Sequence, residues 1–382
     1  MRHVAIITGT RAEYGILKPL IEHIEASDSL QGHLLVGGMH LAPEFGSTIN
    51  QILADGFRID ARIDMLFSSD ARAAMGKGLG IGIYGFTQEI ERLAPDIVMV
   101  LGDRVEMFAG AAAGLCCGAT IAHIHGGEVT QGGLDEYMRH AITKLSHLHF
   151  AATEKSKERI IRLGENPEFV FCVGTPGLDA ILQFPQLSDA ELSQRLMIPI
   201  PERFLLLVQH PISTHPQTAA DEMRETLSAL KEFSIPVFLF YPNSDAGSRE
   251  MLAVIREYET EEWIHTFVNV SRDIYCNLLR RATALIGNTS SGIIDAPAYG
   301  APVVNIGERQ KGRERGENVI DAQPQRESIK QAVHTALFDE AFRQRARTTR
   351  NPYGDGRASE RIGRILESVD LEKAWREKRL PW

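Results

Sequence analysis

The sequence predicts an α/β protein made of two Rossmann-like domains. Short apolar runs alternate with segments of helical period along the chain, and this alternation implies parallel sheets covered by helices. It occurs in two successive series, and Gly and Pro crowd together where the first series ends, at Gly174-Thr-Pro-Gly177. The 382 residues are enough for two domains of ordinary size. We therefore expect domains over residues 1–174 and 175–356, and a helix within 357–382 that packs back on the first domain.

The first series supplies six apolar runs, with helical segments between them. The expected strands are Val4–Thr8, Leu34–Met39, Ile97–Leu101, Ile121–His125, His149–Ala152 and Phe169–Val173. The expected helices lie near 14–26, 47–55, 70–92, 105–116, 136–147 and 155–163. One helix contains Gly80-Ile-Gly-Ile-Tyr-Gly85, a G-x-G-x-x-G match, but no buried strand precedes it. Because a dinucleotide site needs a strand before the glycines, we interpret this stretch as a glycine-rich helix.

The second series repeats the pattern. Its expected strands are Phe204–Gln209, Val237–Tyr241, Ile264–Val268, Ala284–Gly287 and Val303–Ile306, and its helices lie near 218–233, 247–257, 272–282, 291–299 and 326–345. In such sheets a ligand binds in the crevice at the carboxyl ends of the strands. The residues that follow each strand are therefore the candidates for function.

Composition excludes several classes of protein. Asp plus Glu total 50 against 41 Lys plus Arg, a net charge of −9, which argues against nucleic-acid or membrane-surface binding. No apolar run reaches about 18 residues and no leader precedes the first strand, so we expect a cytoplasmic protein without a membrane span. The four cysteines lack C-x-x-C spacing and are expected to be buried free thiols, with no metal site.

The segment Thr120-Ile-Ala-His-Ile-His-Gly-Gly-Glu128 concentrates acid–base groups at a strand end. Strand alternation would place His123 and His125 on one face, and the two glycines permit a sharp turn close to a ligand. Asp135 follows shortly after. This density of titratable groups is expected where protons are moved on a polar substrate.

Two further strand ends carry candidate groups for this chemistry. Asp103 ends a buried strand in Gly-Asp-Arg, where it either faces the ligand or caps the next helix. His210 follows the first strand of the second domain at the equivalent edge.

Two turns, one in each domain, are suited to phosphate, and a basic loop in the second domain is suited to anion binding. Gly9-Thr-Arg-Ala-Glu-Tyr-Gly15 links the first strand to a helix and carries Arg11. This turn suits phosphate, because amides at a helix start and a guanidinium both attract that anion. Gly287-Asn-Thr-Ser-Ser-Gly292 offers the hydroxyls of Thr289, Ser290 and Ser291, and ordinary helix capping is its alternative role.

Asp295 lies one turn further, as an acceptor for a ribose hydroxyl, and the basic loop 307–316 contains Arg309 and Arg313. These residues predict a nucleotide-type ligand.

The motifs Gly9–Gly15, Leu101–Arg104, His123–Glu128, Arg139–Lys144 and Gly287–Gly292, with Arg309–Arg313, occur in one order. Together they resemble the UDP-N-acetylglucosamine 2-epimerase family, and most closely its hydrolysing branch, which serves sialic acid and related nonulosonate synthesis. The resemblance implies the glycosyltransferase-B arrangement of two domains. It also implies a homodimer or homotetramer.

The resemblance implies a reaction as well. The sugar loses its C2 proton, UDP leaves C1 by anti elimination, and water adds to the glycal to give N-acetylmannosamine and UDP, without cofactor or metal. Asp103 and Asp135 match catalytic acids, and His210 matches the histidine of the second domain. The matching nucleotide-binding positions are Arg11, Thr289, Ser290, Asp295, Arg309 and Arg313.

One position departs from the family pattern. Some hydrolysing members have Glu where this chain has His125, so either His125 or Glu128 must serve as the proton shuttle. The substrate is either UDP-N-acetylglucosamine or UDP-N,N′-diacetylbacillosamine. The competing functions are a non-hydrolysing 2-epimerase, a glycosyltransferase of the same fold and a non-catalytic nucleotide-sugar-binding protein. The density of titratable groups argues against the last.

Overall fold

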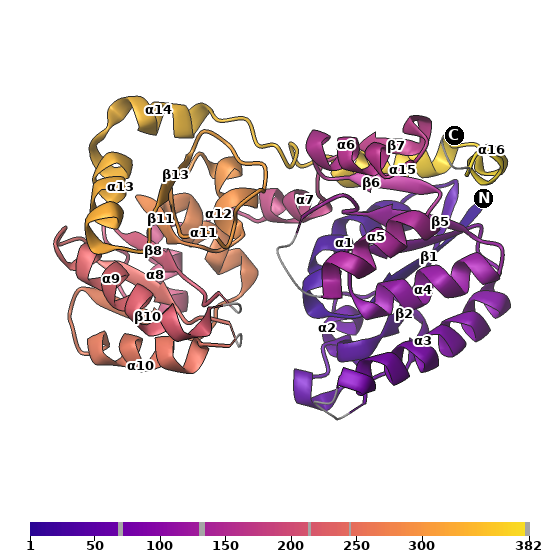
Figure 1. Ribbon diagram of the computed structural model, residues 1–382, viewed down its shortest axis with the longest axis horizontal. Coiled ribbons are helices and arrows are strands. Elements are labelled where there is room, and N and C mark those ends of the chain that lie inside the picture. The colour runs from indigo at the N-terminus through magenta and orange to yellow at the C-terminus, as the bar shows by residue number, and fades with distance from the viewer. Residues whose placement is uncertain (68–71, 130–133, 213–214, 244–245, 379–382) are drawn as a thin grey trace. The chain divides into compact units, whose positions relative to one another are not determined.

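The computed structural model describes residues 1–67, 72–129, 134–212, 215–243 and 246–378. The chain divides into two compact units, the first formed by Met1–Ala180 with Tyr353–Trp382 and the second by Ile181–Pro352 (Figure 1). The first unit thus continues to Ala180, beyond the division expected at residue 174, and the chain returns to it at Tyr353.

The first unit is built on a parallel seven-stranded sheet of order β3-β2-β1-β4-β5-β6-β7. Its strands are β1 (Arg2–Thr8), β2 (Leu30–Gly37), β3 (Ile59–Ile63), β4 (Ile97–Leu101), β5 (Thr120–Ile124), β6 (Leu148–Ala151) and β7 (Val170–Cys172). The order reverses where β1 meets β4, and in open α/β sheets ligands bind at the carboxyl ends of the strands at this switch point.

Alternate residues of these strands enter two separate cores. Val4 and Ile6 of β1 pack on one face, with α1 (Arg11–Glu25) and α15 (Ala358–Ser368). Ala5 and Ile7 pack on the opposite face. The helices of that second face are α3 (Arg72–Leu93), α4 (Val105–Cys116) and α5 (Leu134–Leu145). A strand that is covered on both faces must be apolar at successive positions, which explains the unbroken apolar runs of β1 and β4.

The remaining helices of the first unit connect its strands. They are η1 (Gly38–His40), η2 (Pro43–Phe45), α2 (Ile49–Ala54), α6 (Glu154–Arg162), η3 (Pro167–Phe169) and α7 (Pro176–Gln183), which runs on into the second unit. The glycine-rich stretch from Gly80 to Gly85 lies inside α3, so the interpretation of this stretch as helix is confirmed.

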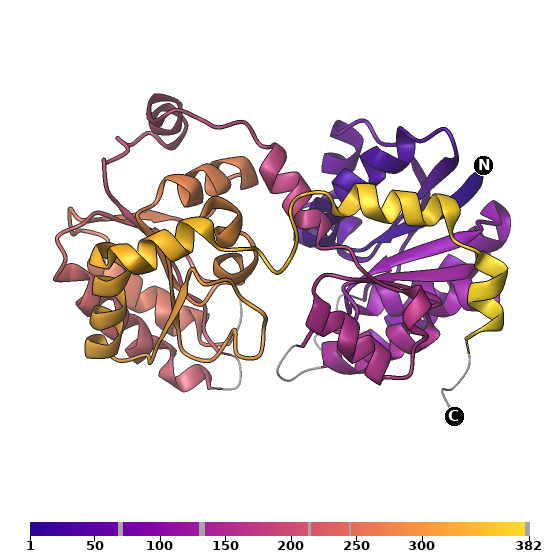
Figure 2. The ribbon, with the colours of Figure 1, turned by 90° about the horizontal axis from the view of Figure 1, so that it is seen from above.

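The C-terminal segment returns to the first unit. Backbone amides of Ala358 and Ser359 donate to the Asp179 carboxylate at 3.0 and 2.6 Å, which satisfies the start of α15. Ile362 and Leu366 then enter the core beside α1, and α15, yellow in Figure 2, lies along this unit. A break after Ser368 separates α15 from α16 (Leu371–Arg376), where Asp370 caps the new helix.

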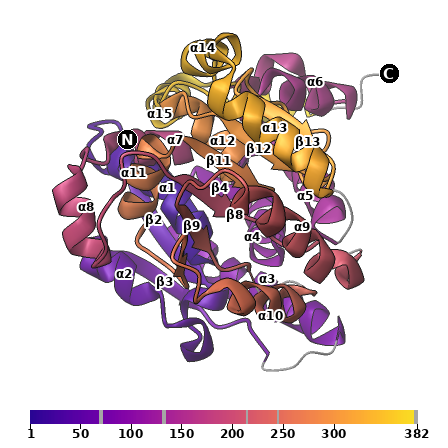
Figure 3. The same cartoon turned by 90° about the vertical axis from the view of Figure 1, so that its left-hand side faces the viewer.

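The second unit contains a parallel six-stranded sheet of order β10-β9-β8-β11-β12-β13. Its strands are β8 (Leu205–Val208), β9 (Val237–Phe240), β10 (Ile264–Phe267), β11 (Ala284–Gly287), β12 (Val303–Ile306) and β13 (Val319–Ala322). Figure 3 shows α9 (Ala219–Lys231), α10 (Ser248–Tyr258) and α13 (Arg326–Phe338) on the side of this sheet that faces the viewer. The other face packs on α11 (Arg272–Arg281) and on η5 (Ala296–Tyr299).

Two helices expected to be continuous are divided. The segment 291–299 forms α12 (Ser291–Ile294) and then η5, with Pro297 in the first turn of η5, because proline lacks the amide that a continuing helix needs. The segment 326–345 forms α13 and α14 (Glu340–Thr348), and Asp339 caps α14. The elements α8 (Asp189–Leu196) and η4 (Pro216–Thr218) complete the unit.

The cysteines correct one expectation. All four are free thiols, but Cys116 and Cys117 are exposed and only Cys276 is fully buried. Cys116 ends α4 and Cys117 begins the turn before β5, where the chain faces solvent. Among the helices of the described residues, none is both long and apolar enough to cross a membrane.

Candidate active site and nucleotide site

Asp103 lies at the switch point of the first sheet, two residues after the end of β4, and is joined to α5 by an ion pair. Its carboxylate accepts a hydrogen bond from the guanidinium of Arg139, which is almost fully buried. Arg139 also donates to the Glu136 carboxylate at 2.7 Å and to the main-chain oxygen of Glu128 at 2.9 Å. One buried guanidinium therefore holds the strand end that carries Asp103 and the turn that carries Glu128. The N-cap of α4 is Arg104, so the alternative in which Asp103 caps that helix is wrong.

His125 and Glu128 form a second group on the turn after β5. The strand ends at Ile124, and His125 has φ of 64°, so the alternation expected to place it on the face of His123 does not reach it. His125 Nδ1 lies 3.6 Å from a carboxylate oxygen of Glu128, and Nε2 lies 2.9 Å from Thr175 Oγ1. Both ring nitrogens thus face groups of the protein.

Gly127 in this turn is required by the turn's geometry. Gly127 has φ of 72°, and a Cβ there would lie 2.2 Å from the main-chain oxygen of Ser156. Only glycine tolerates both the left-handed backbone and this close approach. The sequence prediction of a sharp turn after the histidines is confirmed, although the close approach is to α6.

Two buried carboxylates lie beside Arg104, the residue after Asp103, and were not identified as site residues from the sequence. Glu106 is fully buried in the first turn of α4, and one of its oxygens lies 3.3 Å from Arg104 Nε. Glu13 accepts a hydrogen bond from the amide of Gly9 at 2.9 Å and lies 3.8 Å from the same Arg104 nitrogen. Burial, and then the nearby Glu106, raise the pKa of Glu13 to about 7. Two acids therefore share one guanidinium at the switch point.

Arg11 and Asp135 occupy the first turns of α1 and α5. Arg11 is the first residue of α1 and is exposed, beside the N-cap Thr10. Asp135 is exposed near the start of α5. Burial alone would lower the pKa of Arg104, but the charges of Glu106, Glu13 and Asp135 outweigh burial and raise it. Asp135 therefore contributes to the electrostatic environment of Arg104.

His210 follows β8 in the second unit and is held by Asn288, the residue after β11. The amide of His210 donates to Asn288 Oδ1 at 2.7 Å, and Asn288 Nδ2 donates to the main-chain oxygen of His210 at 2.8 Å. His210 Nδ1 accepts a hydrogen bond from the amide of Asn243 at 3.1 Å. Backbone and ring are thus both fixed.

The hydroxyl-rich turn after β11 lies beside His210. Thr289 Oγ1 is 3.2 Å from Ser291 Oγ and also accepts the Ser291 amide at 3.4 Å. Ser290 precedes α12 without a side-chain capping bond. Asp295 is buried and accepts from Arg272 at 2.6 Å, a partner that the sequence did not indicate. Burial raises the pKa of Asp295, against the opposing effect of Arg272.

The basic loop follows β12 at the same edge of the second sheet. Arg309 Nη1 donates to the main-chain oxygen of Asn288 at 3.3 Å. Gln310 donates to that oxygen at 2.8 Å, and Arg313 is partly exposed one turn further on. His210, the turn after β11 and Arg309 therefore meet at one edge, where Asn288 joins its own turn to the segments after β8 and β12.

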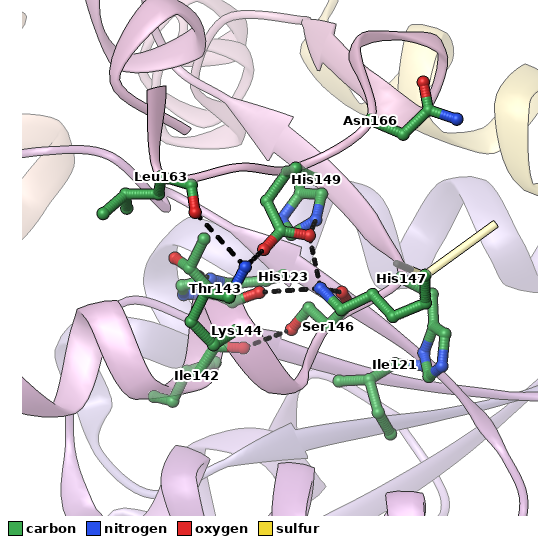
Figure 4. A network of polar contacts seen from close by, with 12 residues as sticks. Ile121, His123, Ile142, Thr143, Lys144, Ser146, His147, His149, Leu163 and Asn166 are labelled. Carbon is green, nitrogen blue, oxygen red and sulfur yellow. Dashed lines mark hydrogen bonds and ion pairs between the residues drawn. The ribbon is translucent and has the colours of Figure 1, made fainter. Parts of the chain in front are cut away.

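A buried network lies beneath the first-unit site, on β5, α5 and β6 (Figure 4). His123 lies 2.7 Å from the oxygen of Gly102 and 3.2 Å from Thr143 Oγ1. His149 lies 3.2 Å from Glu165, whose carboxylate also accepts from Lys144 at 2.6 Å and from Lys378. Lys378 follows α16, so the network ties the end of the chain to the helix that carries Arg139.

This network predicts acid sensitivity of folding. Burial lowers the pKa of His123 to about 3 and that of His147 to about 4, with Lys378 adding to both effects. The unfolded chain binds these protons from about pH 6.5 downward and the folded chain does not, so stability falls as pH falls from about 6.5 to 4. The slope is about 1.4 kcal/mol per pH unit for each histidine.

Urea unfolding at a series of pH values measures this slope. We expect His147→Gln to reduce the slope between pH 6.5 and 4.5 by the contribution of this one histidine. His334→Gln, which replaces an exposed histidine of α13, should leave the slope unchanged. An unchanged slope in a folded His147→Gln variant contradicts the assignment.

No cluster of three His, Cys, Asp or Glu side chains suited to a metal ion is found among the described residues. The titratable groups of both sheet edges are instead paired with arginines, amides and hydroxyls. Such an arrangement can transfer protons and bind anions.

The sequence model of the UDP-N-acetylglucosamine 2-epimerase family matches residues 22–367. The chain belongs to the UDP-N-acetylglucosamine 2-epimerase family. It is 36% identical over 371 residues to UDP-N,N′-diacetylbacillosamine 2-epimerase (hydrolyzing) of Legionella pneumophila, covering 97% of each chain. It is 32% identical to UDP-N-acetylglucosamine 2-epimerase of Neisseria meningitidis serogroup B, covering 99% of this chain and 98% of the other.

A solved structure shows the same fold. It is UDP-GlcNAc 2-epimerase from Neisseria meningitidis bound to UDP-GlcNAc, with a TM-score of 0.80, 18% sequence identity and coverage of 95% of this chain and 99% of that one. The predicted fold class, two Rossmann-like domains of the glycosyltransferase-B type, is confirmed for this epimerase family member.

Proposed function

We propose that this family member is a hydrolysing 2-epimerase of a UDP-2-acetamido sugar. A carboxylate removes the C2 proton, UDP leaves C1 by anti elimination, and water adds across the glycal double bond to give the free 2-epimer. With UDP-N-acetylglucosamine the products are N-acetylmannosamine and UDP. The observation that carries the proposal is the grouping of Asp103, Arg139 and Glu128 at the carboxyl edge of the first sheet.

Within the first unit, Glu128 takes the C2 proton. Both ring nitrogens of His125 already face Thr175 and Glu128, so His125 acts as the partner that holds the Glu128 carboxylate. Asp103 and Asp135 then complete the addition of water. One of them gives the proton that C2 receives, and the other takes a proton from the water that attacks C1. The Arg139 guanidinium keeps the Asp103 and Glu128 segments in register, because a small displacement of reacting groups is costly in rate.

The second unit binds the UDP. Its pyrophosphate engages the turn with Thr289, Ser290 and Ser291, the helix start that follows, and the guanidinium groups of Arg309 and Arg313. His210 donates to the same anion, and Asp295 accepts from the ribose. Fixed donors aimed at the leaving diphosphate lower the barrier to its departure.

The second candidate substrate is UDP-N,N′-diacetylbacillosamine. The Legionella relative named for it is 36% identical to this chain, against 32% for the Neisseria relative named for UDP-N-acetylglucosamine. The chemistry at C1 and C2 is the same for both sugars. Proton NMR of separate incubations with each UDP-sugar distinguishes them.

We expect free UDP and a free 2-epimerised sugar in equal amounts from the true substrate. A 2-epimer still attached to UDP indicates the non-hydrolysing reaction. Release of UDP only after an acceptor sugar is added indicates a glycosyltransferase. Binding of both UDP-sugars without turnover of either one contradicts the proposal.

A further inference from the structure

Asn288 occupies a central position at the carboxyl edge of the second sheet. Its side-chain amide forms two hydrogen bonds with the backbone of His210, as a paired strand would, and its own amide donates to the oxygen of Val208 at 3.1 Å. Its main-chain oxygen accepts from Gln310 and Arg309. The residue is 1% exposed. Asn288 thus uses all its polar groups to connect the segments after β8, β11 and β12.

The ring of His210 is fixed by a separate contact. Asn243 follows β9, and its amide donates to His210 Nδ1. A nitrogen that accepts a hydrogen bond carries no proton, so in the neutral ring the proton sits on Nε2. His210 cannot take up a second proton, on Nδ1, without breaking the bond from Asn243. The contact therefore selects the tautomer in which Nε2–H is a donor.

We propose that Asn288 is a positioning residue that, together with the Asn243 amide, presents His210 as a neutral hydrogen-bond donor through Nε2 to an oxygen of the UDP diphosphate. The proposal rests on the proposed function for the identity of the ligand. Within it, His210 stabilises the leaving anion and transfers no proton. The two bonds from Asn288 fix where the donor lies, and the bond from Asn243 fixes which nitrogen donates.

The tautomer can be measured without substrate. In protein labelled with ¹⁵N-histidine, we expect His210 to show a protonated Nε2 and an unprotonated Nδ1 at pH 7.5, with its signals assigned by comparison with His210→Gln. Added UDP should shift the Nε2 signal. A protonated Nδ1 in the ligand-free protein overturns the proposal, whether or not the protein turns over a UDP-sugar.

The positioning role is tested by Asn288→Ala, with Asn318→Ala as the matched control. Asn318 is also a fully buried asparagine of this unit, but it donates to Ala301 at the opposite edge of the sheet. We expect Asn288→Ala to weaken UDP binding by about 10-fold, the scale of one hydrogen bond to an anion, and to shift the ¹⁵N signals of the His210 ring, because the backbone that holds the ring is released. Asn318→Ala should change neither property.

Equal UDP affinity in a folded Asn288→Ala variant and the wild type contradicts the positioning role. If Asn288→Ala does not fold, Asn288→Asp keeps the acceptor for the His210 amide and loses the donor, and the same loss of affinity is expected. Failure of the proposed function is recognised separately, because it appears as absence of UDP release from either UDP-sugar by the wild type.

Discussion

Asp103→Asn is expected to lower turnover by at least about 100-fold, the usual effect of removing a positioned acid–base group. Asparagine has nearly the same shape as aspartate, so the contact with Arg139 changes in charge and not in size. Arg139 also keeps its bonds to Glu136 and Glu128, which limits the damage to folding. UDP affinity should change little, because the proposed nucleotide residues lie mainly in the second unit.

Asp96→Asn is the control for this substitution. Asp96 lies at the opposite end of the same strand, where its carboxylate accepts the amide of His3 at 2.8 Å. Single-turnover assays of both variants and thermal unfolding separate loss of chemistry from loss of fold. Near-normal turnover by Asp103→Asn removes Asp103 from the catalytic set.

Gly287→Ala is expected to lower the free energy of unfolding by at least about 3 kcal/mol, much more than Gly312→Ala in the same unit. Gly287 has φ of 125°, and a Cβ there would lie 2.1 Å from the main-chain oxygen of Val208. The obstacle is the backbone of a paired strand, so no side-chain rotation relieves it. The strain falls on the residue before Asn288, and His210 should be displaced with it.

Gly312→Ala provides the comparison. Gly312 also has a left-handed φ, 84°, but no atom lies within 4 Å of the position of its Cβ, so the cost is limited to about 1 kcal/mol of backbone strain. Urea unfolding of both variants measures the difference. Equal losses would show that the close approach of β8 and β11 has no energetic consequence.

The sequence predicted the elements whose signal is local. The apolar runs of β1, β4 and β11 identified buried parallel strands, because such strands need apolar residues at successive positions. The edge strand β3 was missed, although Ile59, Ala61 and Ile63 alternate with polar residues as a short edge strand requires. The helix α8 was also missed, and its capping box of Ser188 and Glu191 was the available signal.

The candidate site was predicted at strand ends and incompletely elsewhere. Asp103, His125 and His210 follow strands, so topology alone placed them at the carboxyl edge of each sheet. The assignments of Arg139 and Asn288 depend on partners 36 and 78 residues away in sequence. Those pairings follow from tertiary packing, which composition and spacing do not record. The pairing of Asp295 with Arg272 was missed for the same reason.

The central claim is that the first-unit carboxylates exchange the C2 hydrogen of the sugar. Turnover of the true UDP-sugar in heavy water, followed by proton NMR, tests it most directly. We predict free 2-epimer with one deuterium at C2 and equimolar UDP, and neither product from Glu128→Gln. A released sugar that keeps its C2 proton, or full deuterium incorporation by Glu128→Gln, would contradict the account.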